Sequence, residues 1–370
     1  MYLKSLNVVN FRNYDDVYLD FGENINIIYG DNAQGKTNLL ESIYFLALTK
    51  SHRSFIDDNL IKAGEKISKI KCCLNNNGLD TNLKIILSSS TKKLFVDDNN
   101  YKKVSDYVSR MNVIIFYPED LNLIKDGPIV RRRYINLEIS QLYSGYMDIL
   151  NDYKRLIRIK NNYLKKLKSG VKIDDNYFNT LNDYIIDKSV FIYIMRKKFI
   201  DKINLFCGDI FFDLCGIKGF NIRYRTSIGM DDADKSRIRD ELKRMAGSVF
   251  CDELKLGSNL LGPNLDDFDF YINDMNLKKF GSQGQQRMAV LSIKLSEIEI
   301  FKKYMGTSPI LLLDDVFSEL DNVKKNNLLR YVNSSVQTFI TVTDLDNFND
   351  DMLSNARLFH ITNGIIDKEC

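Results

Sequence analysis

Two short segments at opposite ends of the chain carry residue types that bind and hydrolyse nucleoside triphosphates. The first runs from Gly30 to Thr37 and matches the phosphate-loop pattern G-x-x-x-x-G-K-[ST]. In such a loop the glycines let backbone N–H groups converge on phosphate oxygens, the lysine meets the β- and γ-phosphates, and the hydroxyl ligates Mg²⁺. We therefore expect ATP and Mg²⁺ as cofactors, with Lys36 also acting in catalysis. The expected nucleotide-binding residues of this loop are Gly30, Asp31, Asn32, Ala33, Gln34, Gly35, Lys36 and Thr37.

The second segment, Ile310 to Asp315, is an apolar run closed by two acids. Its length and apolarity predict a buried parallel strand. Asp314, at the C-terminal end of that strand, is expected to hold Mg²⁺ together with Thr37, and Asp315 is expected to face the attacking water as a catalytic residue. Taken alone, the two acids fit equally well as a helix N-cap that follows a strand.

A third segment, Gly281 to Arg287, is rich in small and amide residues. Ser282 and Gly284 begin a predicted helix over residues 284 to 303. A helix N-terminus attracts anions because its first backbone N–H groups are unpaired and its dipole is positive there. An ordinary capped helix start is the alternative. Because the other two segments occur in the same chain, we favour a nucleotide contact by Ser282 and Gly284.

The elements that must position these residues alternate between strand and helix at both ends of the chain. Short strands are predicted within residues 2 to 29, the last of them running into the glycine loop, and the apolar spacing after Thr37 predicts a helix. Further strands are expected between residues 67 and 117, with a hairpin at Asn77-Gly78. From residue 268 onward we expect strands near 268–272, 310–313, 338–342 and 358–361, and helices over 284–303 and 322–332.

A mainly helical insertion separates the two ends. Two long helical runs, broken by Ser169-Gly170, predict a hairpin whose arms each extend about 45 Å at 1.5 Å per residue. A strand near 222–226 and a charged helix over 234–245 are expected to follow. The first arm is amphipathic, and its outer face carries a basic stripe of Lys154, Arg158, Lys165 and Lys168.

Length and composition bound the class of protein. The chain has 370 residues, which suits one large domain or two lobes. We expect an α/β fold in which residues 1–117 plus 268–370 form one lobe and residues 118–267 form a second. With 52 basic and 49 acidic residues, the net charge of +3 gives no global attraction to nucleic acid, so any such binding must use local patches. No C-x-x-C spacing and no apolar run of 18 residues occurs, which predicts a reduced, cytoplasmic protein without zinc, disulfides or a membrane span.

Taken together and in order, the motifs resemble the RecF family, recombination mediators within the ABC and SMC ATPase superfamily. The resemblance runs nearly end to end. No single segment is decisive, but the ordered set is specific. The segments are Asn10-Phe11-Arg12-Asn13-Tyr14, the phosphate loop with Thr37-Asn38-Leu39-Leu40-Glu41, Pro118-Glu119-Asp120, Gly127-Pro128, Arg131-Arg132-Arg133, Phe280 to Arg287, and Leu312 to Asp321.

The resemblance implies an ABC-type P-loop ATPase head with a helical arm lobe, and an ATP-dependent homodimer that sandwiches nucleotides between two heads. It implies that Arg12 contacts the nucleotide and that Ser282 and Gly284 act on the γ-phosphate bound by the partner. It also implies a weak, DNA-stimulated ATPase that acts as a switch at single-strand gaps, duplex junctions or single-stranded DNA. Such a protein co-operates with RecR and RecO in loading RecA and is needed for normal SOS induction. The residues expected at DNA are Arg131, Arg132, Arg133, Lys154, Arg158, Lys165 and Lys168, although a solvated helix face is the alternative for the stripe.

Asp315 stands where most ABC-type sites have Glu, and the shorter side chain predicts slow hydrolysis. The chain also departs from the RecF pattern itself. Asn264 and Leu265 stand where RecF proteins usually have His and Arg, so the role of that pair does not transfer. A transporter subunit is disfavoured because its motifs lie closer together in sequence. An SMC-like structural ATPase, which needs much longer arms, and an ATP-gated DNA clamp that never hydrolyses remain the alternatives.

Overall fold

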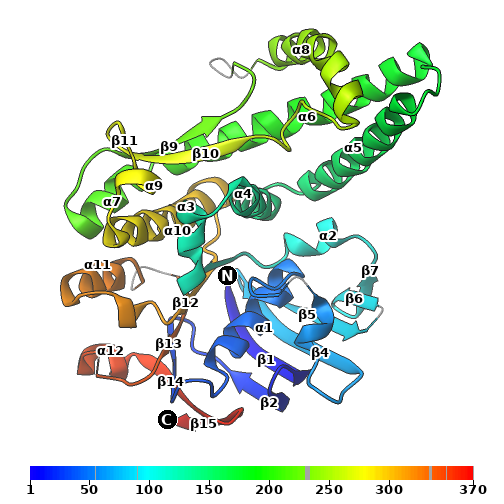
Figure 1. Ribbon diagram of the computed structural model, residues 1–370. Helices are drawn as coiled ribbons and strands as arrows, with labels where there is room; N and C mark the ends of the chain where they lie inside the picture. The colour runs from blue at the N-terminus through cyan, green and yellow to red at the C-terminus, as the bar shows by residue number, and fades with distance from the viewer. Residues whose placement is uncertain (55, 90, 230–233, 333–335, 347, 370) are drawn as a thin grey trace. The chain divides into compact units, whose positions relative to one another are not determined.

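The computed structural model describes residues 1–54, 56–89, 91–229, 234–332, 336–346 and 348–369. The chain folds into two compact units. The first comprises Met1–Leu121, Asp209–Ile217 and Arg287–Cys370, and the second comprises Asn122–Gly208 and Lys218–Gln286. Both ends of the chain therefore fold into one unit, and the second unit is an insertion (Figure 1).

A six-stranded sheet in the first unit carries the two nucleotide motifs, one from each end of the chain. Its strand order is β15-β14-β3-β13-β12-β8. Neighbours from β14 to β8 are parallel, and β15 is antiparallel to β14. β8, β12 and β13 are buried at every position, as expected for apolar strands covered on both faces. The strands are β3 (Ile25–Tyr29), β8 (Val113–Phe116), β12 (Ile310–Asp314), β13 (Thr338–Val342), β14 (Ala356–Thr362) and β15 (Ile365–Glu369).

The second sheet of this unit is antiparallel, in the order β2-β1-β4-β5-β6-β7. Its strands alternate buried and exposed residues, because one face lies on the core. The hairpin predicted at Asn77-Gly78 is confirmed: φ is 52° at Asn77 and 85° at Gly78, the positive values that a two-residue hairpin turn requires. The strands are β1 (Tyr2–Phe11), β2 (Tyr14–Asp20), β4 (Ile67–Asn76), β5 (Leu79–Ser88), β6 (Thr91–Val96) and β7 (Asn99–Tyr101).

Helix α1 (Lys36–Leu48) lies between these two sheets (Figure 1). It contacts β1, β4 and β5 of the antiparallel sheet and β8, β12 and β13 of the other. All residues from Leu39 to Leu48 are buried, because the two sheets cover the helix on both sides. A helix covered in this way needs an apolar surface all round rather than one apolar stripe. Packing on both sides thus fixes the helix whose N-terminus follows the phosphate loop.

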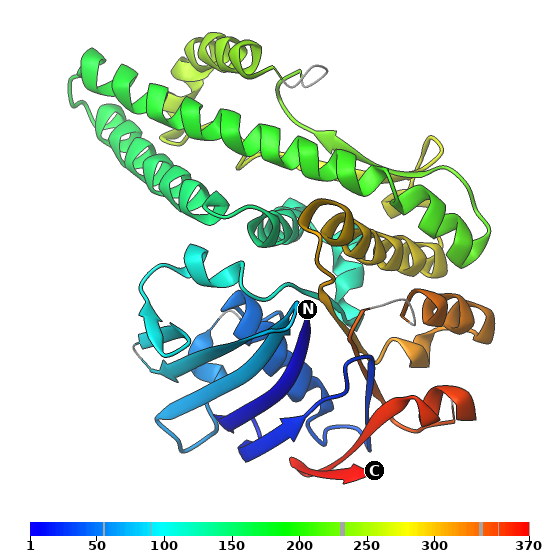
Figure 2. The ribbon, with the colours of Figure 1, turned by 180° about the vertical axis from the view of Figure 1, so that it is seen from behind.

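The second unit is built on the predicted helical hairpin (Figure 2). Its arms are α5 (Tyr146–Lys168) and α6 (Asp175–Asn204), which have 23 and 30 residues, so the first arm is shorter than expected. The break between them includes Gly170 at φ 96°. Helix α8 (Lys235–Leu256) extends well past the predicted 234–245. It packs on α6 through a cluster that comprises Ile186, Val190, Tyr193, Ile228, Ile238, Leu242 and Leu261.

A three-stranded antiparallel sheet completes the second unit, in the order β11-β10-β9. Its strands are β9 (Phe220–Arg225), β10 (Asp267–Ile272) and β11 (Met275–Asn276). Because β10 pairs with β9, the unit continues to Gln286 rather than ending at residue 267 as expected. Residues 209–217 cluster instead with the first unit, where Asp213 accepts hydrogen bonds from Asn327 and Tyr331.

The remaining elements connect or cover these layers. None of the helices within the described ranges is long and apolar enough to span a membrane. The elements not yet named are η1 (Asp57–Leu60), α2 (Val104–Val108), η2 (Pro118–Leu121), α3 (Asn122–Lys125), α4 (Pro128–Leu142), α7 (Cys207–Cys215), α9 (Leu277–Phe280), α10 (Gln283–Met305), η3 (Phe317–Glu319), α11 (Asn322–Val332) and α12 (Asp350–Ser354).

Candidate nucleotide-binding site

The two distant motifs meet at one edge of the parallel sheet. β3 leads into the phosphate loop and lies beside β13, which lies beside β12. Since the three strands are parallel, their carboxyl ends share an edge, where ligands of such sheets bind. In register, Asp314 stands beside Thr341 on β13, whose next residue, Val342, stands beside Tyr29. The strand order therefore brings residues of the first and last thirds of the chain together.

The phosphate loop needs glycine at two positions for steric reasons. Gly30 has φ 143°, and a Cβ there would lie 2.4 Å from the Ile361 carbonyl oxygen. Gly35 has φ 119°, and a Cβ there would lie 2.6 Å from Asn13 Nδ2. Side chains are excluded at both positions by backbone conformation and by space. The glycine spacing is thus a property of how tightly the loop is packed.

Two turns from elsewhere in the first unit hold this loop. In the β1–β2 turn, Asn13 Nδ2 donates to the Gln34 carbonyl at 3.1 Å and Tyr14 Oη donates to the Gly35 carbonyl at 2.8 Å. In the β14–β15 turn, the N–H of Asn363 donates to Gln34 Oε1 at 2.6 Å and that of Gly364 donates to the Gln34 carbonyl at 3.1 Å. The loop conformation is therefore held from both sides by hydrogen bonds to described residues.

The Lys36 ammonium lies within the curve of the loop. Its Nζ donates to the carbonyl oxygens of Gly30 at 2.5 Å and Asp31 at 2.8 Å. Burial lowers the pKa of Lys36, and the carboxylates of Asp315, Asp314 and Asp31 oppose that shift. The cation is thus held at the point where a phosphate chain would enter a loop of this type.

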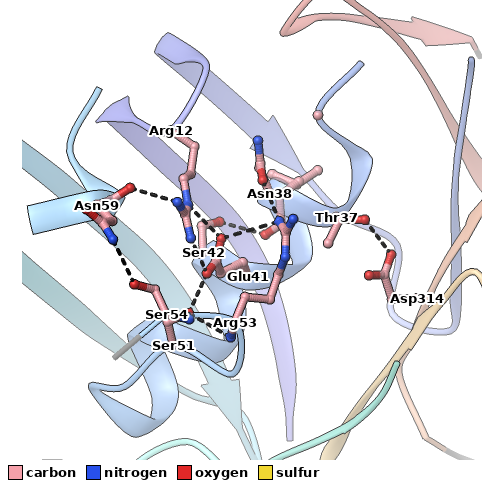
Figure 3. Close-up of polar contacts among 12 residues, drawn as sticks. Arg12, Thr37, Asn38, Glu41, Ser42, Ser51, Arg53, Ser54, Asn59 and Asp314 are labelled. Carbon is pink, nitrogen blue, oxygen red and sulfur yellow. Dashed lines mark hydrogen bonds and ion pairs between the residues drawn. The ribbon is translucent and has the colours of Figure 1, made fainter. Parts of the chain in front are cut away.

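Thr37 and Asp314 form the direct contact between the two motifs (Figure 3). Thr37 Oγ1 donates to Asp314 Oδ1 at 2.9 Å, and Thr341 Oγ1 donates to the same oxygen at 2.7 Å. Burial raises the pKa of Asp314, and these two hydroxyls oppose the shift. The exposed Asp315 has φ 53°, and its N–H donates to Thr341 Oγ1 at 2.9 Å. Thr341 was not identified from the sequence, because nothing local marks one threonine of a buried strand.

The donor set fits Mg²⁺ and the phosphate chain of ATP. A hydroxyl and a carboxylate side by side are the hard oxygen ligands that Mg²⁺ accepts, with its other positions left to water and phosphate. Thr37 and Asp314 supply that pair. The two glycines at positive φ and the lysine supply a cradle for an anion. The described residues contain no group of three or more His, Cys, Asp or Glu side chains that could hold a metal by themselves.

Arg12 is committed to a buried carboxylate on α1 (Figure 3). Its Nε and one terminal nitrogen donate to the two oxygens of Glu41, each at 2.8 Å, and the other terminal nitrogen donates to the Asn59 carbonyl at 2.7 Å. Ser51 Oγ also donates to Glu41. The Glu41 side chain is fully buried, and despite that burial the Arg12 and Ser51 hydrogen bonds leave its pKa below the usual value.

Ser282 and Gly284 lie in the second unit at the start of α10. Ser282 Oγ accepts from the N–H of Gln285 at 3.2 Å, and the Ser282 N–H donates to Gln285 Oε1 at 2.9 Å, which makes a reciprocal capping box. Ser282, Gln283 and Gly284 are all exposed. The helix start is therefore capped, as the alternative interpretation expected, and its small residues nevertheless face solvent.

The expected DNA residues divide into two groups. The side chain of Arg131 is 5% exposed and forms a double hydrogen bond with Asp267, at 2.6 and 2.9 Å. This burial corrects the expectation that Arg131 meets DNA, because its guanidinium is already paired in the core of the second unit. Arg132 is partly buried and donates to the Asp266 carbonyl, and Arg133 is also partly buried. The stripe on α5 is exposed at all four positions, Lys154, Arg158, Lys165 and Lys168.

The acids after Asn264 have a structural role that the sequence did not reveal. Asp267 pairs with Arg131, and Asp266 lies 3.5 Å from the buried Arg196 and accepts a hydrogen bond of 2.5 Å from Tyr224. Burial raises the pKa of Asp266 to about 6. Asn264, which stands where RecF proteins usually have His, accepts a hydrogen bond from Tyr153 Oη.

Comparisons with known proteins agree over the whole chain. A family profile described as RecF/RecN/SMC N terminal domain matches residues 2–367. The DNA replication and repair protein RecF of Pediococcus pentosaceus is 39% identical over 368 residues, which cover 99% of this chain and 98% of that protein. The protein of the same name from Staphylococcus haemolyticus is 38% identical over 371 residues and covers 100% of both chains.

Solved structures give the same picture of the fold. A structure of the recombination mediator protein RecF with ATP, in the RecFOR pathway, is 32% identical to this chain with a TM-score of 0.92, and the match covers 100% of this chain and 98% of that one. An Smc head bound to the C-winged helix domain of ScpA matches with a TM-score of 0.56 at 14% identity, over 100% and 97% of the two chains. The second match shows likeness in fold alone. The fold is the α/β ABC-type ATPase head that the motifs predicted.

Proposed function

Because this chain belongs to the RecF family of DNA replication and repair proteins, we propose that it is an ATP-dependent DNA-binding protein of recombinational repair and replication restart. It acts in the cytoplasm as a slow, DNA-stimulated ATPase that dimerises when ATP is bound. The dimer binds gapped or single-stranded DNA, helps RecR and RecO to load RecA at single-strand gaps, and supports SOS induction. A relative of known structure is described as a recombination mediator with ATP in the RecFOR pathway, which supports this reading.

The observation that carries the proposal is the hydrogen bond between Thr37 and Asp314, which joins the phosphate loop to the acidic strand end. In this site Lys36 binds the β- and γ-phosphates, Thr37 and Asp314 hold Mg²⁺, and Asp315 orients the attacking water. When bound, Mg²⁺ neutralises charge that develops on the phosphate oxygens. The protein residues thus bind and position the nucleotide and the Mg²⁺ ion, and the oxygen ligands that Mg²⁺ needs from the protein are present.

The remaining site residues act through the second copy and through α1. Ser282 and Gly284 face solvent at a helix start, where they meet the γ-phosphate held by the partner. Arg12 contacts the nucleotide from the β1–β2 turn through the N–H groups that Glu41 and Asn59 do not use. ATP thus completes an interface that neither copy forms alone, and hydrolysis releases it.

Two glycines on helices offer a matched test of this interface. Gly284 on α10 and Gly247 on α8 are both exposed, and a Cβ at either one meets nothing within 4 Å. Gly284→Arg is expected to abolish the ATP-dependent rise in mass measured by sedimentation, while the monomer keeps its affinity for ATP. Gly247→Arg is expected to dimerise like the unaltered protein. ADP and nucleotide-free samples give the baseline.

Three results would contradict the proposal. ATP that leaves the mass of the unaltered protein unchanged removes the split-site dimer. Equal dimerisation of the Gly284→Arg and unaltered proteins removes Gly284 from the interface. A Lys36→Ala protein that still binds ATP with full affinity removes the phosphate loop as the nucleotide site.

The exposed stripe on α5 supports DNA binding by the second unit. Replacing Lys154, Arg158, Lys165 and Lys168 by Gln removes four charges that face solvent. If each meets a phosphate, the slope of log affinity against log salt falls by roughly 3 to 4, since each contact contributes about 0.9. The control replaces Lys66, Lys69, Lys71 and Lys93, four exposed lysines of the first unit, and should leave the slope unchanged. A smaller slope only in the control would move the DNA site to the first unit.

The non-hydrolysing clamp remains the competing function because Asp315 is short for its role. Phosphate release by the unaltered protein and by Lys36→Arg, each with and without gapped DNA, separates the two. Release that depends on Lys36 and rises with DNA supports a switch. No release above that of Lys36→Arg, together with ATP-dependent DNA binding, would establish the clamp instead.

A further inference from the structure

The three-stranded sheet of the second unit has an open edge at β9. β9 is the last strand in the order β11-β10-β9, and it lies beside α6 (Figure 1). The side-chain amide of Asn204, the last residue of α6, accepts from the Ile222 N–H and donates to the Ile222 carbonyl, both at 2.8 Å. These are the two hydrogen bonds that a residue of a neighbouring antiparallel strand would form. Asn204 therefore occupies the place of a further strand at Ile222.

Tyr224 is the next residue whose backbone faces this edge. Backbone N–H and C=O groups alternate in direction along a strand, so Tyr224 directs both groups away from β10, as Ile222 does two residues earlier. Among the described residues neither group has a hydrogen-bond partner, and the bond from Tyr224 to Asp266 uses the tyrosine hydroxyl. One helical turn before Asn204, α6 carries Ile200, whose apolar side chain cannot bond to these groups. The edge is therefore capped at Ile222 and open at Tyr224.

A groove of about 620 Å³ lies along the open part of the edge. Its lining includes Ile200 and Asp201 of α6 and residues 222–226, which form the end of β9 and the position after it. Ile200 and Ile228 also line the groove and are only 3% and 4% exposed, so part of the lining is apolar. A volume of this size is typical of ligand sites, and its position at a strand edge suits an extended chain.

Two arginines of β9 lie on the face of the strand opposite to Tyr224. Their side chains are 50% exposed at Arg223 and 64% exposed at Arg225. Arg223 donates to Asp274, in the turn after β10, and Arg225 donates to Asp267 and Asp269 of β10. The hydrogen bonds of both arginines to described residues use Nε and Nη2. The two N–H groups on each Nη1 are therefore left for a ligand.

We propose that the β9 edge binds an extended, acidic segment of another protein as an added antiparallel strand. One residue of the segment exchanges two hydrogen bonds with the Tyr224 backbone, as in other peptides that extend a sheet. Its side chain lies on the same face as that of Tyr224, toward Ile200 and Ile228, so an apolar residue fits there. The residues on either side of it lie beside Arg223 and Arg225, where acids fit because opposite charges on neighbouring strands attract. The recognised pattern is acidic, apolar, acidic.

The test measures peptide binding by fluorescence anisotropy, with the full-length protein and no nucleotide, since this site goes beyond the proposed function and does not require ATP. The probe is a short labelled peptide that alternates glutamate and valine and has capped ends, and saturable binding is expected. A peptide that alternates lysine and valine should bind at least about ten-fold more weakly. Methylating the backbone nitrogen of the central valine removes the donor to the Tyr224 carbonyl and should weaken binding about ten-fold.

Three variants locate the site. Arg223→Glu should weaken binding of the glutamate peptide about ten- to a hundred-fold and strengthen binding of the lysine peptide, because it reverses a charge beside the added strand. Asp201→Trp should abolish binding of the glutamate peptide by filling the groove. Lys198→Trp is its matched control and should bind like the unaltered protein, since both positions are exposed on α6 but Lys198 lies outside the groove. Melting curves check that each variant is folded.

Several results would overturn the proposal. If the unaltered protein shows no saturable binding of the glutamate peptide, the edge is not a site for acidic strands. Equal affinities for the methylated and unmethylated peptides would show attraction by charge without strand pairing. Equal binding by folded Asp201→Trp and by the unaltered protein would place the peptide outside the groove. If single-stranded DNA displaces the peptide and folded Asp201→Trp binds that DNA more weakly, the groove belongs to nucleic acid instead.

Discussion

Thr37 Oγ1 donates a hydrogen bond to Asp314 Oδ1 at 2.9 Å, although the two residues are 277 positions apart in the chain. Thr341 stands on the other side of the same carboxylate and donates to the same oxygen at 2.7 Å. Its hydroxyl also accepts from the N–H of Asp315. One threonine on β13 therefore orients both the carboxylate that we propose as the Mg²⁺ ligand and the backbone of the acid that we propose as catalytic.

Thr341→Val should lower Mg²⁺-dependent hydrolysis about 10- to 100-fold, because residues that orient a metal ligand have effects of that size. The variant keeps the shape of the side chain but leaves Asp314 with one hydroxyl donor. The measurement is the Mg²⁺ concentration that gives half-maximal phosphate release, with ATP binding in EDTA as the reference. Thr338→Val is the matched control, since Thr338 is a buried threonine of the same strand whose hydroxyl donates to the Val336 carbonyl. An identical Mg²⁺ dependence for the two variants would show that Thr341 has no special role.

Asp315→Glu should raise the single-turnover rate of hydrolysis, because the longer side chain brings the carboxylate closer to the attacking water. Asp315→Asn should reduce hydrolysis strongly while ATP binding persists. The backbone limits the gain: φ at Asp315 is 53°, a left-handed conformation that Asn and Asp tolerate better than Glu, at a cost of about 1 kcal/mol. Rapid-mixing measurements give the rate, and a wild-type rate above that of Asp315→Glu contradicts this prediction.

Arg131→Met should destabilise the second unit rather than weaken its contact with DNA. It leaves Asp267 buried and paired with Arg225 alone, whose side chain is 64% exposed. Breaking one partner of a buried ion pair costs about 3 to 5 kcal/mol, and the remaining pair favours the lower end. Urea unfolding measures the loss. Arg158→Met, on the exposed stripe, should change stability by less than about 0.5 kcal/mol but should weaken DNA binding. The reverse assignment of the two effects would restore Arg131 to the DNA surface.

His52 should make the first unit less stable in mild acid. Its ring lies between Tyr44 and Tyr117, with centroid distances of 5.2 and 4.7 Å, and neither ring nitrogen has a hydrogen-bond partner among the described residues. Burial lowers the pKa of His52 to about 4, and the Glu41 charge opposes that shift. The folded state therefore disfavours the protonated ring. Its contribution is fully present above the unfolded pKa of 6.5 and is lost as the pH falls toward 4, by up to about 3 kcal/mol.

The check is the difference in unfolding free energy between the unaltered protein and His52→Phe from pH 7.5 to pH 4. Phe keeps the aromatic contacts and cannot take up a proton, so the variant should lose less stability on acidification. His360→Phe is the control, because these are the two histidines of the chain and His360 packs on Tyr29 instead. Parallel pH curves for the His52 variant and the unaltered protein would refute the prediction.

Local features of the site were determined by the sequence itself. The positive φ angles of Gly30 and Gly35, the Asn77-Gly78 hairpin and the apolar run of β12 all follow from residue types within a few adjacent positions. The same is true of most helices and strands, whose positions agree with the expected ranges. The ends of elements were predicted less exactly. Helix α8 runs to Leu256, whereas residue 245 was expected to end it, because packing against the rest of the second unit cannot be inferred from a short stretch of sequence.

The neighbours of each site residue were decided by the tertiary structure. β3 lies between β14 and β13, although those strands follow it by about 300 residues, and this order supplies Thr341 beside Asp314 and Gly364 beside the phosphate loop. Hydrophobic periodicity predicts that a strand exists but carries no information on which strand it pairs with. For the same reason the pairing of β9 with β10 could not be predicted, and with it the extension of the second unit to Gln286.

Burial also separated residues that look alike in sequence. Arg131 and Arg158 are both basic residues of predicted helices, yet Arg131 is buried against Asp267, 136 positions away, while Arg158 faces solvent. The sequence by itself determined which chemistry the chain holds, because residue type and spacing are local. The tertiary structure decided which charges are available for that chemistry, because desolvation and pairing depend on partners that are distant in the chain.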